Sequence, residues 1–194
     1  MADIRYDYCI GTTNARLKKT VAAMLAEAGY YSAGEGKSIP ELLRRLRSVQ
    51  PWLVIVDTAL PPGNIEELAE IIETDGLAAS IYINTTGAST LDRYVQLTWP
   101  TDAPVLTAVA DAVCTEFSRK KKLQKEIETL QTRLKERKVV EKAKGVLASH
   151  YGMSEDQSYR FLQKRSMERR LTMAEIAELV INNPGLFSSL SQRR

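Results

Sequence analysis

The 194 residues suffice for one ordinary domain and a smaller second one, and 44% of them are hydrophobic, so a sizeable core is expected. No run of about 18 apolar residues and no basic N-terminal stretch before an apolar segment occurs, so we expect a cytoplasmic protein without a membrane contact. Two cysteines and one histidine are too few for a disulfide framework and lack metal-ligand spacing, so we predict no metal site and no cofactor.

Charge is distributed unevenly along the chain. Residues 1–118 contain 9 Lys and Arg against 15 Asp and Glu, a net charge of −6, whereas residues 119–170 contain 16 against 7, a net charge of +9. This division predicts an acidic N-terminal domain followed by a basic segment that binds a polyanion. The single histidine, His150, has no nucleophile or carboxylate pattern that would partner it, so we expect no enzymatic activity.

The N-terminal part alternates short apolar runs with amphipathic segments, which is typical of a parallel sheet covered by helices. Strands are expected at residues 6–10, 30–33, 52–56, 80–83 and 94–98. Helices are expected on the apolar repeat from Leu17 to Ala28, after the capping-box sequence Ser38 to Glu41, and over residues 65–73. The order predicts a doubly wound, flavodoxin-like α/β domain over residues 1–118.

Asp57 follows the apolar run 52–56 and is expected at the carboxyl edge of the sheet, where such domains carry their function. Here the chain resembles, over about residues 4–118, the receiver domain of response regulators in bacterial two-component systems. In that family such an aspartate accepts a phosphoryl group from a histidine kinase. The resemblance implies that Thr85 would contact the phosphoryl oxygens, and the alternative is that Asp57 only caps the turn that follows.

The receiver pattern is incomplete. Thr12 and Thr13 stand where the family has an acidic pair that binds magnesium, which prefers anionic oxygen ligands. Trp99, before Pro100, stands where the family has a lysine that stabilises the phosphoryl group. We therefore predict a degenerate receiver, or pseudo-receiver, that is not phosphorylated in the conventional way.

The interval between the fourth and fifth expected strands is short. Thr85 and Pro100 are only fifteen positions apart in the sequence, and a helix of about three turns would occupy most of the residues between them. We therefore expect the receiver's fourth helix to be shortened or lost, with residues 87–90 forming a loop.

A long helix is predicted next, because residues 105–149 contain no proline and no glycine before Gly145. Within it, apolar side chains four, three and four residues apart are typical of a coiled-coil seam: Leu123, Ile127, Leu130 and Leu134. We assign residues 119–138 as a coiled-coil linker of a parallel homodimer. The alternative is that this stripe packs on its own domain.

Two further capping-box sequences, Ser154 to Gln157 and Thr172 to Glu175, predict two short helices. Three apolar stripes accompany them: Val139, Val140, Ala143 and Leu147; Tyr159, Leu162 and Ser166; and Met173, Ile176, Ala177, Val180 and Ile181. The run from Asn182 to Gly185 ends the last helix. We predict a three-helix module over residues 139–183 and a disordered tail over residues 184–194.

This module resembles the ANTAR domain, over about residues 123–182, and is most similar to the ethanolamine-utilisation type. The resemblance rests on EKAKGVL at 141–147, SEDQSY at 154–159, Leu162, RSMERR at 165–170 and IAEL at 176–179. Members of that family bind paired RNA hairpins in leader transcripts and prevent a terminator from forming. Ser158 stands where the family usually has alanine.

The resemblance implies an RNA-binding set: Ala143, Lys144, Gly145, Tyr159, Arg165, Ser166, Arg169 and Arg170. The basic side chains can neutralise phosphates or bond base edges in a loop, although a charged helix face is often only solvated. Ala143 and Gly145 can admit the RNA backbone closely or serve helix packing. Tyr159 can stack on an unpaired base or belong to the core.

Together these patterns predict an RNA-binding transcription antitermination regulator with an atypical, phosphorylation-independent receiver, acting as a dimer so that two modules engage two hairpins. Two alternatives remain. Three short helices with a basic one can form a DNA-binding helix-turn-helix, which would make the chain a DNA-binding response regulator. The chain can also be an adaptor whose coiled coil and receiver bind another regulatory protein.

Overall fold

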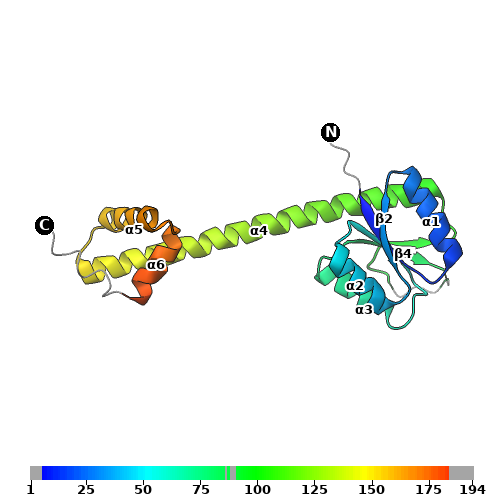
Figure 1. The fold of residues 1–194 in the computed structure, drawn as a ribbon, viewed down its shortest axis with the longest axis horizontal. Coiled ribbons are helices and arrows are strands. Elements are labelled where there is room, and N and C mark those ends of the chain that lie inside the picture. The colour runs from blue at the N-terminus through cyan, green and yellow to red at the C-terminus, as the bar shows by residue number, and fades with distance from the viewer. Residues whose placement is uncertain (1–5, 86, 88–90, 184–194) are drawn as a thin grey trace. The chain divides into compact units, whose positions relative to one another are not determined.

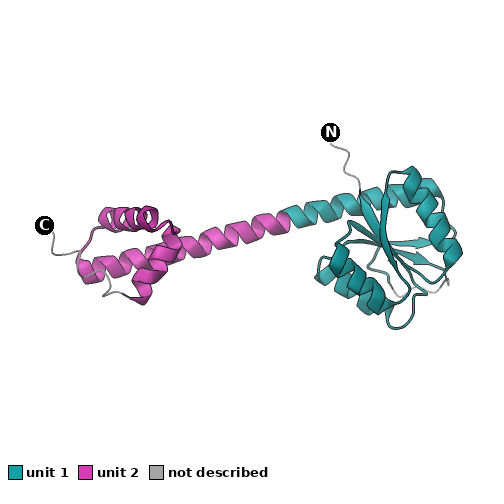
Figure 2. Ribbon diagram, in the orientation of Figure 1, with its two compact units in different colours: residues 1–122 teal, residues 123–194 magenta. Residues whose placement is uncertain are grey.

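The computed structural model describes residues 6–85, 87 and 91–183. The chain forms two compact units, residues 1–122 and residues 123–194 (Figure 2), and the boundary lies inside one long helix, α4 (Ala103–Tyr151). Across the described residues, every helix is too short or too polar to cross a membrane.

The first unit is built on one sheet of five strands, and every neighbouring pair is parallel. The strands are β1 (Asp7–Gly11), β2 (Tyr31–Gly36), β3 (Leu53–Asp57), β4 (Ala79–Asn84) and β5 (Gln96–Thr98). Their order in the sheet is β2-β1-β3-β4-β5, which is the flavodoxin-like doubly wound order. The predicted fold class is confirmed, although β5 begins two residues later than expected.

Two pairs of helices cover the two faces of this sheet (Figure 1): α1 (Ala15–Glu27) with the first part of α4, and α2 (Ile39–Val49) with α3 (Ile65–Thr74). Side chains alternate along each strand, so Leu53 and Ile55 face the first pair while Val54 and Val56 face the second. The first layer receives Leu17, Val21, Leu25, Leu106, Ala110 and Cys114, and the second receives Leu42, Leu46, Leu68, Ala69 and Ile72.

Helix starts in this unit depend on side-chain oxygens. The Ser38 hydroxyl accepts a hydrogen bond from the Glu41 amide at 3.4 Å, as a helix cap should. The Glu41 carboxylate, however, accepts from the amide of Lys37 at 2.9 Å and not from that of Ser38. The predicted capping box at α2 is therefore only half formed.

The described residues between β4 and β5 contain no helix, in agreement with the short interval in the sequence. Gly87 has a φ of +79°, a left-handed conformation that suits glycine. Residues 88–90, the rest of the predicted loop, lie outside the described residues.

The second unit consists of the end of α4, α5 (Glu155–Arg169) and α6 (Met173–Asn182). Both predicted capping boxes form here: the Ser154 amide donates to the Gln157 side chain at 2.8 Å, and the Thr172 amide donates to Glu175 at 2.7 Å. The buried core contains Ala143, Leu147, Leu162, Ile176, Ala177 and Val180. Helix α6 ends at Asn182; the predicted tail lies outside the described residues.

One face of α5 was predicted incorrectly. The stripe Tyr159, Leu162 and Ser166 was expected to point into the core, but the buried residues of α5 are Ser158 and Leu162. Tyr159 is 46% exposed. The helix is therefore oriented so that the small Ser158 side chain is buried and the Tyr159 ring is not.

Candidate nucleic-acid interface

Asp57 ends β3 at the carboxyl edge of the sheet and is buried. The Thr12 hydroxyl donates to its Oδ2 atom at 2.7 Å, and the Thr85 hydroxyl and the Ala59 amide donate to Oδ1 at 2.8 and 3.0 Å. Both carboxylate oxygens are therefore satisfied by the chain itself. The hydroxyl that replaces the first acid of the receiver pattern acts as a hydrogen-bond donor to the aspartate.

These groups do not fit a magnesium ion. Thr12 donates its proton to Asp57, and its oxygen also accepts from the Asn14 amide at 3.0 Å, so it is neither anionic nor open for a cation. Thr13 is exposed. Within the described residues no cluster of three or more His, Cys, Asp or Glu side chains is placed to hold a metal ion.

Trp99 occupies the position expected for the receiver lysine. Its indole packs against the cluster between the sheet, α1 and α4, and its peptide bond to Pro100 is cis. An uncharged ring that contributes to the core cannot supply the cation that stabilises a phosphoryl group. The assignment of Trp99 to the lysine position stays a prediction, and the structure shows that this side chain packs against the core.

Ala143 and Gly145, predicted to let RNA approach closely, have different surroundings. Ala143 is fully buried in the core of the second unit, so it is unavailable to RNA and its role is helix packing. A Cβ atom added at Gly145 would meet no heavy atom within 4 Å. Of the two residues, only Gly145 offers the open backbone that the prediction required.

Lys144 is an internal ion-pair partner. Its ammonium donates to Glu141 at 2.9 Å and to Glu155, at the start of α5, at 2.7 Å, and only 11% of its side chain is exposed. These two carboxylates raise the pKa of Lys144, with Glu155 the larger cause, and Lys144 lowers the pKa of Glu155. Lys144 therefore links α4 to α5, and its charge is already balanced before any phosphate arrives.

The basic residues at the end of α5 also differ in whether a carboxylate of the chain pairs with them. The Arg165 guanidinium pairs with Glu168 at 2.8 Å, and its central carbon lies 5.5 Å from the centroid of the Phe161 ring. Arg169 and Arg170 are exposed, and Arg170 ends the helix in a left-handed conformation with a φ of 56°. The Ser166 carbonyl accepts a hydrogen bond from the Arg170 amide, so the backbone of Ser166 helps to terminate α5.

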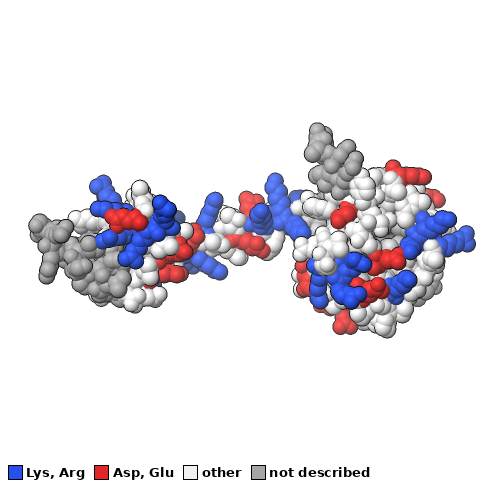
Figure 3. Space-filling view, viewed as in Figure 1, with Lys and Arg blue, Asp and Glu red and all other residues white. Residues whose placement is uncertain are grey.

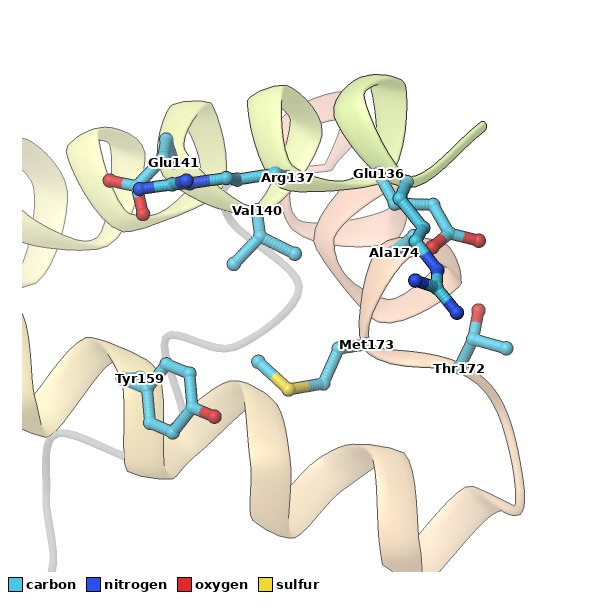
Figure 4. A pocket seen from close by; sticks show the side chains of 9 residues that line it. Glu136, Arg137, Val140, Glu141, Tyr159, Thr172, Met173 and Ala174 are labelled. Carbon is cyan, nitrogen blue, oxygen red and sulfur yellow. The ribbon is translucent and has the colours of Figure 1, made fainter. Parts of the chain in front are cut away.

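A pocket of about 490 Å³ lies in the second unit between α4, α5 and the start of α6 (Figure 4). Val140 points into it from α4, opposite the ring of Tyr159 on α5 and the side chain of Met173 on α6. Arg133 and Arg137 line its α4 side. Both arginines lie in the segment 119–138, which was predicted as a coiled-coil linker. Only their spacing of four residues, which places them on one helix face, could have indicated that they line the same pocket.

Cationic side chains lie over the helices of the second unit with acidic ones between them, on the face seen in Figure 3. Among the described residues, Arg133, Arg137, Arg169 and Arg170 make no ion pair, whereas Lys144, Lys164 and Arg165 do. Unpaired cations among the described residues of the second unit therefore include two on the pocket wall and two at the end of α5.

The predicted seam is exposed along α4. Leu123, Ile127, Leu130 and Leu134 are 50, 47, 55 and 54% exposed. Large apolar side chains that repeat on one helix face, and that no described residue of the chain covers, are typical of a coiled-coil surface. Their exposure favours the predicted coiled-coil seam over packing of the stripe on its own domain.

Comparison with known proteins agrees with this architecture. Residues 128–181 match the ANTAR domain. The transcriptional regulatory protein PdtaR of Mycobacterium tuberculosis is 28% identical over 183 residues, which cover 91% of this chain and 89% of PdtaR. The chain therefore carries an ANTAR domain and is homologous to PdtaR, and the finer likeness to the ethanolamine-utilisation type stays a prediction.

Solved receiver domains share the fold of the first unit. The signal receiver domain of a Vibrio parahaemolyticus protein assigned as a LuxO repressor aligns with a TM-score of 0.54 at 14% identity, over 62% of this chain and 98% of that domain. The beryllofluoride-activated NtrC4 receiver domain dimer aligns with a TM-score of 0.51 at 15% identity, over 57% of this chain and 98% of that domain.

Proposed function

We propose that this protein is a transcription antitermination regulator that binds paired RNA hairpins in leader transcripts and so prevents a terminator from forming. The match of residues 128–181 to the ANTAR domain is the observation that carries this function. The homology to the transcriptional regulator PdtaR along most of both chains supports the same assignment. The unbalanced arginines of the second unit supply the charge that an RNA backbone requires.

The RNA surface consists of Gly145, Tyr159, Arg169 and Arg170, together with the arginines of the pocket. Arg169 and Arg170 are exposed and can meet phosphates, whereas Lys144 joins α4 to α5 and Arg165 is paired with Glu168 within α5. An unpaired loop base can stack on the exposed ring of Tyr159. Ala143 supports this surface from the core.

The active form is a parallel homodimer through the exposed seam of α4. Four half-exposed apolar side chains at coiled-coil spacing support this state, because water would otherwise cover all of them. Two ANTAR modules in one particle match two hairpins in one transcript. Binding both hairpins through one dimer increases the overall affinity, because the second contact becomes intramolecular.

The receiver domain works without phosphorylation of Asp57. Its carboxylate is held by two threonine hydroxyls and an amide, and it lacks the acidic pair and the lysine that the reaction uses. The domain therefore serves as a scaffold for α4 and as a surface for a regulatory protein partner.

The test is the affinity for a hairpin pair compared with that for duplex DNA of the same sequence. Wild-type protein is used to select RNAs from a pool of tandem hairpins with randomised loops, and the selected RNA is compared with its DNA duplex across a salt series. We expect strong preference for the RNA. The double variant Arg169→Ala/Arg170→Ala should bind many RNAs more weakly. The slope of the logarithm of the binding constant against the logarithm of the salt concentration should become less steep by roughly one for each lost phosphate contact.

A matched variant, Lys164→Ala, removes one exposed charge of α5 that is already paired with Glu168. It should change the salt slope less than either arginine substitution. Equal affinity for duplex DNA would favour the helix-turn-helix alternative, and the absence of any salt-dependent polyanion binding would favour the adaptor.

A further inference from the structure

The pocket lined by Tyr159, Val140, Met173, Arg133 and Arg137, called here the Tyr159 pocket, has a mixed lining suited to one kind of ligand. Its floor and walls are apolar, from an isopropyl group, a thioether and a phenol ring, and they come from three different helices (Figure 4). Its volume of about 490 Å³ falls within the range of small-ligand sites. A flat aromatic group would contact all three surfaces.

The rim of the pocket carries two arginines beside two carboxylates, Glu136 and Glu141, and Glu141 is itself paired with Lys144. Arg133 and Arg137 lie four residues apart on α4, so both guanidinium groups serve the same face. Neither pairs with a carboxylate of the described residues, whereas Lys144, two turns along, is held by two. The arginine donors thus remain available for phosphate oxygens, which they bind in a bidentate manner.

The same rim carries acceptors. Glu136 lines the pocket, and among the described residues it makes no ion pair. A carboxylate accepts hydrogen bonds from the exocyclic amino groups of bases. Thr172 is less available, because its hydroxyl donates to Glu175 at 2.9 Å to cap α6.

We propose that the Tyr159 pocket holds one unpaired nucleobase of the bound RNA loop, stacked on the Tyr159 ring, with a neighbouring phosphate on Arg133 and Arg137. This inference rests on the RNA-binding function proposed above and assigns it a specific subsite. In this proposal the base is recognised where the three helices meet. Lys144 and Arg165 do not contact it, because carboxylates of the chain already pair with both.

The experiment is a cycle that combines protein variants with modified RNA. The probe is a fluorescein-labelled hairpin taken from a random-loop pool selected with wild-type protein, and each loop nucleotide is replaced in turn by an abasic one. For the wild type, one abasic position should weaken binding by about tenfold or more, the range expected for a stacked base. Tyr159→Ala should lose a similar factor on the intact hairpin, and the same abasic position should then cost little more.

Two matched controls keep the result specific. Met167→Ala removes the other large exposed apolar side chain of α5, which does not line the pocket, so it should keep the full abasic penalty. Arg160→Ala removes an exposed charge of α5 outside the pocket and should also keep it. Arg137→Ala should reduce both the affinity and the salt slope. Unchanged circular dichroism confirms that each variant is folded.

Three outcomes overturn the pocket. If Tyr159→Ala and every abasic position weaken binding independently, the base lies elsewhere while the RNA-binding function stands. If Tyr159→Ala lowers the RNA-free mass in sedimentation without changing the abasic penalty, the pocket belongs to the dimer interface. If the wild type selects no hairpin at low salt, the proposed function itself fails, and the subsite with it.

Discussion

Replacing Ser158 by alanine should stabilise the second unit. Ser158 is fully buried, and its hydroxyl has no hydrogen-bond partner among the described residues. A buried hydroxyl without a partner costs about 1–3 kcal/mol, because it gives up its hydrogen bonds to water and regains none. Alanine also has the higher helix propensity, by at most about 0.7 kcal/mol. The loss of one oxygen's packing contacts offsets part of this, so the net gain should be about 1–2 kcal/mol.

The position of the two tryptophans makes the assay selective. Trp52 and Trp99 both belong to the first unit, so tryptophan fluorescence follows only its unfolding, whereas far-UV circular dichroism follows both units. In urea, Ser158→Ala should move the circular-dichroism transition of the helical unit to higher denaturant. The fluorescence transition should stay where it is.

Ser149→Ala is the matched control. Ser149 is exposed on α4, and its hydroxyl bonds the Val146 carbonyl at 3.1 Å, so this substitution changes helix propensity without relieving a buried polar group. The difference between the two variants isolates the buried hydroxyl. A Ser158→Ala protein no more stable than Ser149→Ala would refute the reasoning, since it would mean that the Ser158 hydroxyl has a partner in solution.

Three further outcomes are expected. Magnesium and acetyl phosphate should leave the intact mass of the protein unchanged, because hydrogen bonds from Thr12, Thr85 and the Ala59 amide occupy the Asp57 carboxylate and no cluster of three or more metal-ligating side chains lies there among the described residues; a stable adduct of one phosphoryl group would contradict this. Ile127→Asp/Leu130→Asp should sediment as a monomer, since charges without opposite partners in the seam cost several kcal/mol, on the order of 3–5. The pKa of Glu155 is lowered by Lys144, so the pair stabilises the fold above the ordinary carboxyl pKa of 4.5, and this contribution is lost as pH falls through the lowered pKa. The urea midpoints of wild type and Glu155→Gln should therefore differ at pH 7 and converge in acid.

The parts of the fold that were predictable from sequence depend on local chemistry. The capping boxes beginning at Ser154 and Thr172 place two helix starts, because the residues that satisfy the orphan amides lie within three positions of one another. The parallel strands are apparent from apolar runs that are buried on both faces. The short interval after Thr85 excluded a helix there because chain length alone limits what can fit.

The parts that were not predictable depend on contacts between helices. The α5 periodicity allows either Tyr159 or Ser158 to face the core, since the two differ by only about 100° around the axis. In the structure Ser158 is the one that is buried, while Tyr159 is 46% exposed. The pairing of Lys144 with Glu155 joins two helices, and a sequence pattern within either helix alone cannot report it. The RNA-binding set therefore contained two residues that the fold uses for itself, Ala143 and Lys144.

Helix α4, a single helix from Ala103 to Tyr151, passes through three successive environments. Near its start, Leu106 and Ala110 are buried against the receiver sheet, and near its end, Ala143 and Leu147 are buried against α5 and α6. Between these two cores the apolar stripe around Ile127 continues, and the part of the chain that the structure describes leaves it about half exposed. A solvated linker needs only polar residues, and leucines there expose apolar surface at a cost of roughly 25 cal/mol per Å². In the proposed homodimer, the α4 helix of a second copy would cover this stripe, and the same contact would bring two ANTAR modules to one transcript.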